Sequence, residues 1–110
     1  MTIDQLIKET GWKMITAASE GSREIHGAYC GDLLSWVMGR GQPDQAWITV
    51  QSHINVIAVA SLREFACVIL ADGAEWPPEV IEKAEAEGIP LIQSPVPSFE
   101  TARKLIELGV

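Results

Sequence analysis

Short apolar runs alternate with helix-like stretches through most of the chain, and this alternation constrains the fold more than any other feature. The runs are rich in β-branched residues and end in small polar residues; they cover residues 26–30, 46–50, 66–70 and 89–92. Strands that alternate with helical patterns indicate βαβ units and a parallel sheet. We therefore predict an α/β fold: a single small domain with a mainly parallel sheet and helices packed on it.

The segment Ile54–Leu62 has a pattern that fits either a strand or a helix. It is nearly all apolar and rich in β-branched residues, so propensity alone would allow a strand. The strands on either side of it, however, can be parallel only if a crossover of about a dozen residues joins them. This segment has the right length for that crossover, and we predict that it forms a buried helix.

Polar residues mark the expected starts of two other helices. Asp32 is expected to N-cap the helix that follows residues 26–30. Ser98 is expected to cap the last helix, with Phe99 and Ile106 on its inward face. A polar loop is predicted over residues 17–24.

The composition fits one globular domain over residues 1–110, with 47% hydrophobic and 21% charged residues. The formal net charge of −7 argues against binding to a nucleic-acid backbone, which needs clustered Lys and Arg. The N-terminus lacks the features of a signal peptide, and no apolar stretch approaches the length of a membrane span. We expect a cytoplasmic protein with no nucleic-acid or membrane partner.

The two cysteines, Cys30 and Cys67, stand apart in apolar surroundings and lack the spacing of metal ligands. Two thiols are too few for a disulfide framework, so we predict buried free thiols. His26 and His53 show no spacing that would complete a metal site with them. No metal and no cofactor are predicted.

The ends of the predicted strands carry most of the candidate functional residues. In open α/β sheets, ligands bind in the crevice beyond the carboxyl ends of the strands. Small and polar residues occupy those positions here. The candidate ligand-binding residues are Gly31, Asp32, Gln51, Ser52, His53, Asp72, Gly73 and Ser94.

The trio Gln51-Ser52-His53 is the strongest of these candidates, because it follows a strand and separates two apolar segments. Ser52 and nearby backbone amides could hold an anion or ribose hydroxyls, with His53 as a titratable contact. Alternatively, Ser52 caps the following helix and His53 is hydrogen-bonded at its edge. For two other candidates we favour a purely structural role. Asp32 is expected to cap its own helix, and Asp72-Gly73 is expected to form a turn.

Three segments together resemble a DRTGG domain: residues 23–39 (REIHGAYCGDLLSWVMG), residues 46–73 (AWITVQSHINVIAVASLREFACVILADG) and residues 80–92 (VIEKAEAEGIPLI). The resemblance runs from about Leu6 to Leu108. Stand-alone members of this family are often described as relatives of the N-terminal domain of HPr kinase. The resemblance implies a regulatory or interaction module that is commonly dimeric.

The chain departs from the family pattern at both motifs that give the family its name. Ser52-His53-Ile54 stands where the family has an Asp-Arg pair, and Ala71-Asp72-Gly73 stands where it has Thr-Gly-Gly. The kinase relationship implies no catalysis, because the chain has no phosphate-binding loop of the G-x-x-x-x-G-K-[ST] type.

These observations favour a non-catalytic regulatory module that senses a ligand, such as a nucleotide or a phosphorylated metabolite. The acidic balance, with Asp32 and Asp72 near the site, favours a monophosphate or an amide-bearing ligand over a bare polyphosphate. One alternative is a pure protein-interaction module without a small ligand. Another is a small enzyme that uses His53 and Asp72.

A homodimer is predicted from the apolar content, the four tryptophans and the family resemblance. Trp36, which is expected on the helix after Asp32, is the residue that we would place at an interface.

Overall fold

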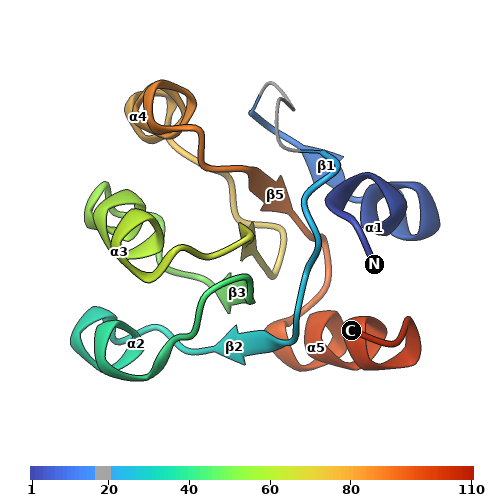
Figure 1. The fold of residues 1–110 in the computed structure, drawn as a ribbon. Helices are drawn as coiled ribbons and strands as arrows, with labels where there is room; N and C mark the ends of the chain where they lie inside the picture. The colour runs from blue at the N-terminus through green and yellow to red at the C-terminus, as the bar shows by residue number, and fades with distance from the viewer. Residues whose placement is uncertain (17–20) are drawn as a thin grey trace.

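Five strands form one sheet in the computed structural model, which describes residues 1–16 and 21–110 (Figure 1). The strand order is β1-β5-β4-β3-β2. The neighbouring strands from β2 to β5 pair in parallel, and β1 pairs antiparallel with β5. The prediction of a mainly parallel α/β sheet is confirmed. The strands are β1 (Lys13–Met14), β2 (Ala28–Cys30), β3 (Ala46–Thr49), β4 (Cys67–Leu70) and β5 (Leu91–Gln93).

Helices cover both faces of the sheet. Figure 1 shows α2, α3 and α4 on one face and α1 and α5 on the other. The helices are α1 (Ile3–Thr10), α2 (Leu34–Arg40), α3 (Asn55–Arg63), α4 (Pro78–Glu87) and α5 (Ser98–Glu107). The part of the chain that the structure describes contains no helix long and apolar enough to span a bilayer.

The ambiguous apolar segment forms α3, one residue further along the chain than predicted. It connects β3 to β4, which pair in parallel, so the crossover argument identified its structure correctly where propensity did not. Val56, Ile57 and Ala60 are fully buried against the sheet.

The parallel strands contribute side chains to two hydrophobic clusters, one on each face. Trp47, Val68 and Leu91 pack on the α2–α4 side, whereas Ile48 and Ile69 pack on the α1–α5 side. Burial on both faces explains why these strands read as continuous apolar runs rather than as alternating patterns. The predicted strand over residues 26–30 begins only at Ala28, because Gly27 takes a positive φ of 81°.

Two expectations about helix starts are wrong. Leu33 occupies the N-cap position of α2, and no side chain caps that helix, so Asp32 lies outside it. Ser98 is the first residue of α5, after Pro97 at the N-cap position.

The inward face of α5 was also predicted incorrectly. Phe99 is 70% exposed and Ile106 is 73% exposed, whereas Thr101 and Leu105 are buried. The buried stripe therefore follows Thr101 and Leu105, and Phe99 and Ile106 lie together on a flank of the helix. The predicted loop at residues 17–24 lies partly outside the described residues.

Candidate ligand-binding site

Asp32 follows β2 and connects this strand to the end of β3. One carboxylate oxygen, Oδ1, accepts hydrogen bonds from the Thr49 hydroxyl at 2.8 Å and from the Val50 amide at 2.9 Å. Thr49 is fully buried, so its hydroxyl needs a partner inside the protein. Asp32 supplies that partner, and this interaction takes the place of the predicted helix cap.

Gly31 is held by the same two strands. Its amide donates to the Ile48 carbonyl at 3.1 Å, and its carbonyl accepts from Nε1 of Trp47 at 2.8 Å. A Cβ at this position would lie 3.1 Å from the Tyr29 ring. Gly31 and Asp32 therefore help to join β2 and β3 at the carboxyl edge of the sheet.

The loop between β3 and α3 contains the predicted trio. The Gln51 amide donates to the Thr49 hydroxyl at 3.0 Å, and Nδ1 of His53 accepts from the Asn55 amide at 3.1 Å. Ile54 occupies the N-cap position of α3 without a side-chain cap, so Ser52 does not cap this helix.

Several donors of this loop remain unused within residues 1–16 and 21–110. They are the amide and hydroxyl of Ser52, the amide of Ile54 and Nε2 of His53, none of which forms a hydrogen bond there. Because Nδ1 of His53 accepts from a backbone amide, the neutral ring carries its proton on Nε2. The N-terminal end of α3 thus presents hydrogen-bond donors to the outside.

The residues that carry these donors line a cavity of about 400 Å³ between the N-terminal ends of α3 and α4. We call it the α3–α4 cavity. It is lined by Gln51, Ser52, His53, Ile54, Pro77, Glu79 and Val80. The cavity is an open hollow on the surface, and only its volume lies within the range of roughly 300–1,000 Å³ that is typical of small-molecule sites.

The two sides of the α3–α4 cavity differ in their electrostatics. The α3 side combines free donors with the positive end of the helix dipole. The α4 side begins with Pro77 and Pro78, which have no N–H groups, and it adds the carboxylate of Glu79. The cavity therefore suits a ligand with an acceptor or anionic group at one end and donors at the other.

The loop after β4 is a tight turn bound to the segment after β5. Asp72 and Gly73 both have positive φ, at 64° and 72°. Their amides donate to the carbonyls of Val96 at 2.7 Å and Ser94 at 3.1 Å. This geometry agrees with the turn interpretation of Asp72-Gly73, and Asp is one of the few non-glycine residues that tolerate such a φ.

Ser94 has its side chain inside the protein. It is 1% exposed, and its hydroxyl lies 2.8 Å from the hydroxyl of Thr101 on α5. The Ser94 side chain therefore fixes the start of α5 against β5.

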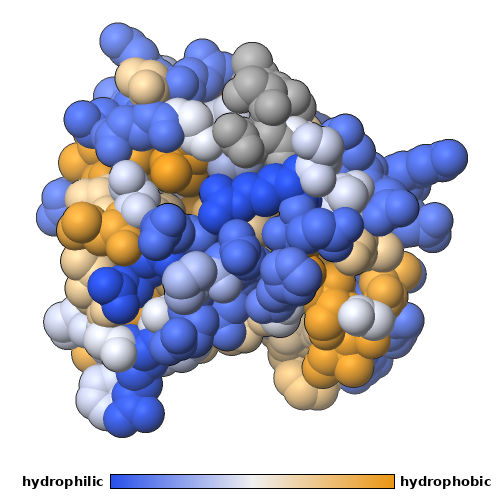
Figure 2. Space-filling view, viewed as in Figure 1, coloured by the Kyte–Doolittle hydropathy of each residue, from blue (hydrophilic) through white to orange (hydrophobic). Residues whose placement is uncertain are grey.

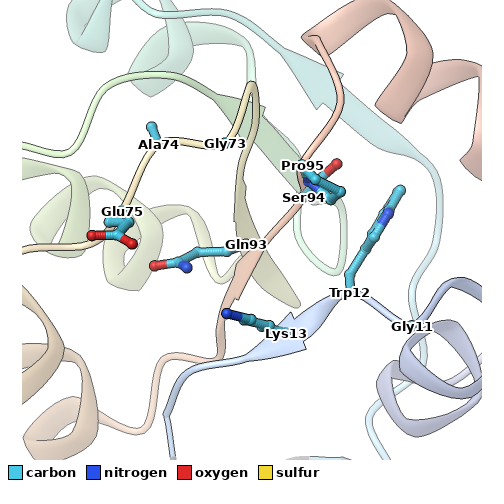
Figure 3. Close-up of a pocket in the computed structure, with 9 residues that line it drawn as sticks. All are labelled: Gly11, Trp12, Lys13, Gly73, Ala74, Glu75, Gln93, Ser94 and Pro95. Carbon is cyan, nitrogen blue, oxygen red and sulfur yellow. The ribbon is translucent and has the colours of Figure 1, made fainter.

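A second cavity of about 240 Å³, the β1–β5 cavity, lies at the same sheet edge. In Figure 3 the side chains of Lys13 and Gln93, from adjacent strands, extend toward the side where Glu75 lies. Sequence reasoning missed this cavity, because the βαβ pattern does not place the two-residue strand β1 beside β5. Its lining residues are Gly11, Trp12, Lys13, Gly73, Ala74, Glu75, Gln93, Ser94 and Pro95.

The eight predicted site residues are thus divided among different surroundings. Gln51, Ser52 and His53 line the α3–α4 cavity, and Gly73 and Ser94 line the β1–β5 cavity. Gly31, Asp32 and Asp72 line neither of these two cavities.

Two arrangements that the sequence raised, a His53–Asp72 pair and a metal site, are not found in the described part of the chain. His53 and Asp72 form no hydrogen bond with each other. Within residues 1–16 and 21–110 no group of three His, Cys, Asp or Glu side chains could hold a metal ion.

Both cysteines are free, and their surroundings disfavour the thiolate. Cys67 is buried as predicted, whereas the prediction of a buried thiol is wrong for Cys30, which is exposed on the edge strand β2. Burial raises the pKa of the Cys67 thiol from 9.0 to about 12. Partial burial, together with the nearby carboxylate of Asp32, raises the pKa of Cys30.

A mainly parallel sheet covered on both faces, with cavities at its carboxyl edge, defines a small α/β domain. The chain belongs to the DRTGG domain family, whose model matches residues 6–108. No curated protein matches the sequence. The Asp72-Gly73 turn, with its two positive φ values, stands where the resemblance placed the family's paired glycines.

One solved structure is similar over nearly the whole chain. It is the crystal structure of the CBS and DRTGG domains of the regulatory region of a Clostridium perfringens pyrophosphatase, complexed with its activator diadenosine tetraphosphate. The TM-score is 0.69 at 18% sequence identity, and the match covers 96% of this chain and 45% of that one. At this identity the likeness shows a shared fold, and this chain spans less than half the length of its neighbour.

Proposed function

We propose that this DRTGG domain is a non-catalytic regulatory module that binds a small ligand in the α3–α4 cavity. The ligand class that we propose is a nucleotide or another phosphorylated metabolite with a single phosphate. The observation that carries the proposal is the set of unused donors from Ser52, His53 and Ile54 that lines this cavity.

The chemistry of the cavity supports this ligand class. A phosphate can accept hydrogen bonds from the α3 end, where the helix dipole also favours negative charge. Glu79 on the opposite side can accept from ribose hydroxyls or from an amino group. A polyphosphate would bring several charges near this carboxylate into a chain with a net charge of −7, so a monophosphate fits better.

The structural neighbour offers independent support for a regulatory role. Its DRTGG domain belongs to a regulatory region whose complex contains a nucleotide activator. We extend from this neighbour only the general role of nucleotide sensing, since the two chains share 18% identity.

The test measures the binding of AMP, ATP and diadenosine tetraphosphate to the purified protein, both by the shift in melting temperature and by calorimetric titration. A ligand that binds only the folded state raises the melting temperature by mass action. We expect AMP to bind, and the double substitution Ser52→Ala, His53→Ala to weaken its binding at least roughly tenfold, equivalent to about 1.4 kcal/mol. Ser61→Ala, at the opposite end of α3, is the matched control and should bind as the wild type does.

A pure protein-interaction module remains the second candidate, because Asp32, Gly31 and Ser94 are occupied by contacts within the protein. Absence of binding by all three nucleotides would favour that candidate. AMP binding that the double substitution leaves unchanged would contradict the location of the site.

A further inference from the structure

The β1–β5 cavity is lined by two side chains of opposite charge. They are Lys13, at the start of β1, and Glu75, in the loop between β4 and α4, and both are exposed. Within residues 1–16 and 21–110, neither side chain forms an ion pair or a hydrogen bond. The ammonium group and the carboxylate are therefore both free to bind a ligand.

Lys13 and Gln93 form a pair of donors that the sheet holds together. They are direct partners in the antiparallel ladder between β1 and β5. The side chains of such partners lie on the same face of the sheet, with Cβ atoms roughly 4.5–5.5 Å apart.

A hydrogen bond also fixes the orientation of the Gln93 amide. Its Oε1 atom accepts from the Trp76 amide at 2.9 Å, and its Nε2 group has no acceptor among the described residues. The free end of this side chain is therefore a donor. Nε2 of Gln93 and Nζ of Lys13 can donate to the two oxygens of one carboxylate, and the bond from the ammonium is strengthened by charge.

The loop that carries Glu75 is attached to β5 on both sides of this residue. Before it, the Gly73 amide donates to the Ser94 carbonyl at 3.1 Å. After it, the indole Nε1 of Trp76, a residue that is 4% exposed, donates to the Ile92 carbonyl at 3.2 Å. Because the loop is already held in place, a ligand that binds to Glu75 has little backbone to order.

The three polar side chains of the cavity are arranged in a row. In Figure 3 the Gln93 amide lies between the Glu75 carboxylate and the Lys13 ammonium, with its nitrogen on the side of Lys13. Donors therefore gather at one end of the row, and the acceptor is at the other end. Such a row is complementary to a ligand that carries a negative group and a positive group.

The size of the cavity favours a small ligand. Its volume of about 240 Å³ is below the range of roughly 300–1,000 Å³ that is typical of sites for larger organic molecules. Hydrophobic side chains gather elsewhere on the surface: Figure 2 shows a group of them over α5, which contributes no residue to this cavity. The cavity therefore suits a small charged molecule rather than an apolar one.

We propose that the β1–β5 cavity binds a free α-amino acid, as an effector site separate from the α3–α4 cavity. The ligand carboxylate accepts hydrogen bonds from Nζ of Lys13 and Nε2 of Gln93, and the ligand ammonium group donates to the Glu75 carboxylate. An α-amino acid carries both charges on one carbon atom and has no net charge at neutral pH. The net charge of −7 on this chain therefore does not repel it.

Analogues of one amino acid test the need for both charges. The probes are glycine, L-alanine and L-serine, which are small enough for the cavity, and calorimetric titration measures their binding to the purified protein. We expect L-alanine to bind and to raise the melting temperature. L-alaninamide lacks the carboxylate and N-acetyl-L-alanine lacks the ammonium group, so each should bind at least roughly tenfold more weakly.

Charge substitutions test the two ends of the row. Lys13→Gln and Glu75→Gln should each weaken the binding of L-alanine roughly tenfold or more. The matched controls are Lys8→Gln on α1 and Glu82→Gln on α4, which make the same charge changes at exposed positions outside the cavity. Both controls should bind L-alanine as the wild type does, and circular dichroism shows that each variant is folded.

Three results would overturn the proposal. The first is that none of glycine, L-alanine and L-serine binds to the wild type. The second is that L-alaninamide or N-acetyl-L-alanine binds as tightly as L-alanine, which would show that one charge is enough. The third is that Lys13→Gln and Glu75→Gln leave the binding of L-alanine unchanged, which would place the amino acid elsewhere on the protein.

Discussion

The Asp32 carboxylate accepts a hydrogen bond from the Thr49 hydroxyl, 2.8 Å away, and this contact joins the carboxyl ends of β2 and β3. The same oxygen also accepts from the Val50 amide. The bond fixes the start of the loop that carries Gln51, Ser52 and His53. A residue that resembled a helix cap in the sequence therefore supports the framework of the proposed site.

Removal of the Asp32 carboxylate should destabilise the fold. Asp32→Ala leaves the proton of the buried Thr49 hydroxyl without its acceptor, although the Gln51 amide still donates to this oxygen. Hydrogen bonds to charged groups contribute about 1.5–3 kcal/mol. Because Asp32 is exposed, we expect the free energy of unfolding to fall by about 1–2 kcal/mol in urea denaturation. Thr49→Val is the partner variant, and the double variant should lose less than the sum of the single losses. Strictly additive losses would show that the two side chains do not interact in solution.

Two glycines near the end of α2 should respond to alanine in opposite directions. A Cβ at Gly41 would overlap the ring of Phe65, which is fully buried and cannot move away. Gly41→Ala should therefore lower the free energy of unfolding by about 1–3 kcal/mol. Gly39 lies in the same helix with nothing within 4 Å of its Cβ position, so Gly39→Ala should raise it by about 0.5–1 kcal/mol. A similar effect of both substitutions would contradict the packing of α2.

Alkaline pH should destabilise the protein through Cys67. In the unfolded chain this thiol ionises near its ordinary pKa of 9.0, whereas burial in the fold raises the pKa to about 12. The stabilising contribution is complete below pH 9 and is lost as the pH rises toward 12, because only the unfolded chain can ionise there. The free energy of unfolding, measured by denaturation at several pH values across this range, should fall more steeply with rising pH for the wild type than for Cys67→Ala. An identical pH dependence of the two proteins would contradict the buried, protonated thiol.

Local patterns predicted the parts of the fold that depend on chain connectivity. The crossover length identified α3 although its β-branched residues fit a strand equally well. By contrast, the role of Asp32 depends on Thr49, which lies 17 positions further along, and a helix-cap rule takes no account of such a partner. Phe99 and Ile106 were assigned to the core because they are apolar, and only the packing of α5 shows which flank is buried.

The candidate site, like the fold, could be predicted from the sequence only in part. The rule about strand carboxyl ends located Gln51, Ser52 and His53 at a cavity, because all three follow β3 directly. The rule could not distinguish them from Ser94, whose hydroxyl bonds to Thr101 within the protein. The contribution of Glu79 was missed, since this residue lies on a helix rather than at a strand end. The βαβ pattern does not predict that β1 pairs antiparallel with β5, and the β1–β5 cavity depends on this pairing.

The most direct test of the proposed function is an amide NMR titration of the ¹⁵N-labelled protein with AMP. We predict saturable shifts that centre on the amides of Ser52, His53, Ile54 and Glu79, with the amides around Lys13 and Gln93 unaffected. Shifts confined to Lys13, Gly73 and Gln93 would place the ligand in the β1–β5 cavity instead. That result, or an unchanged spectrum at saturating AMP, would contradict the account.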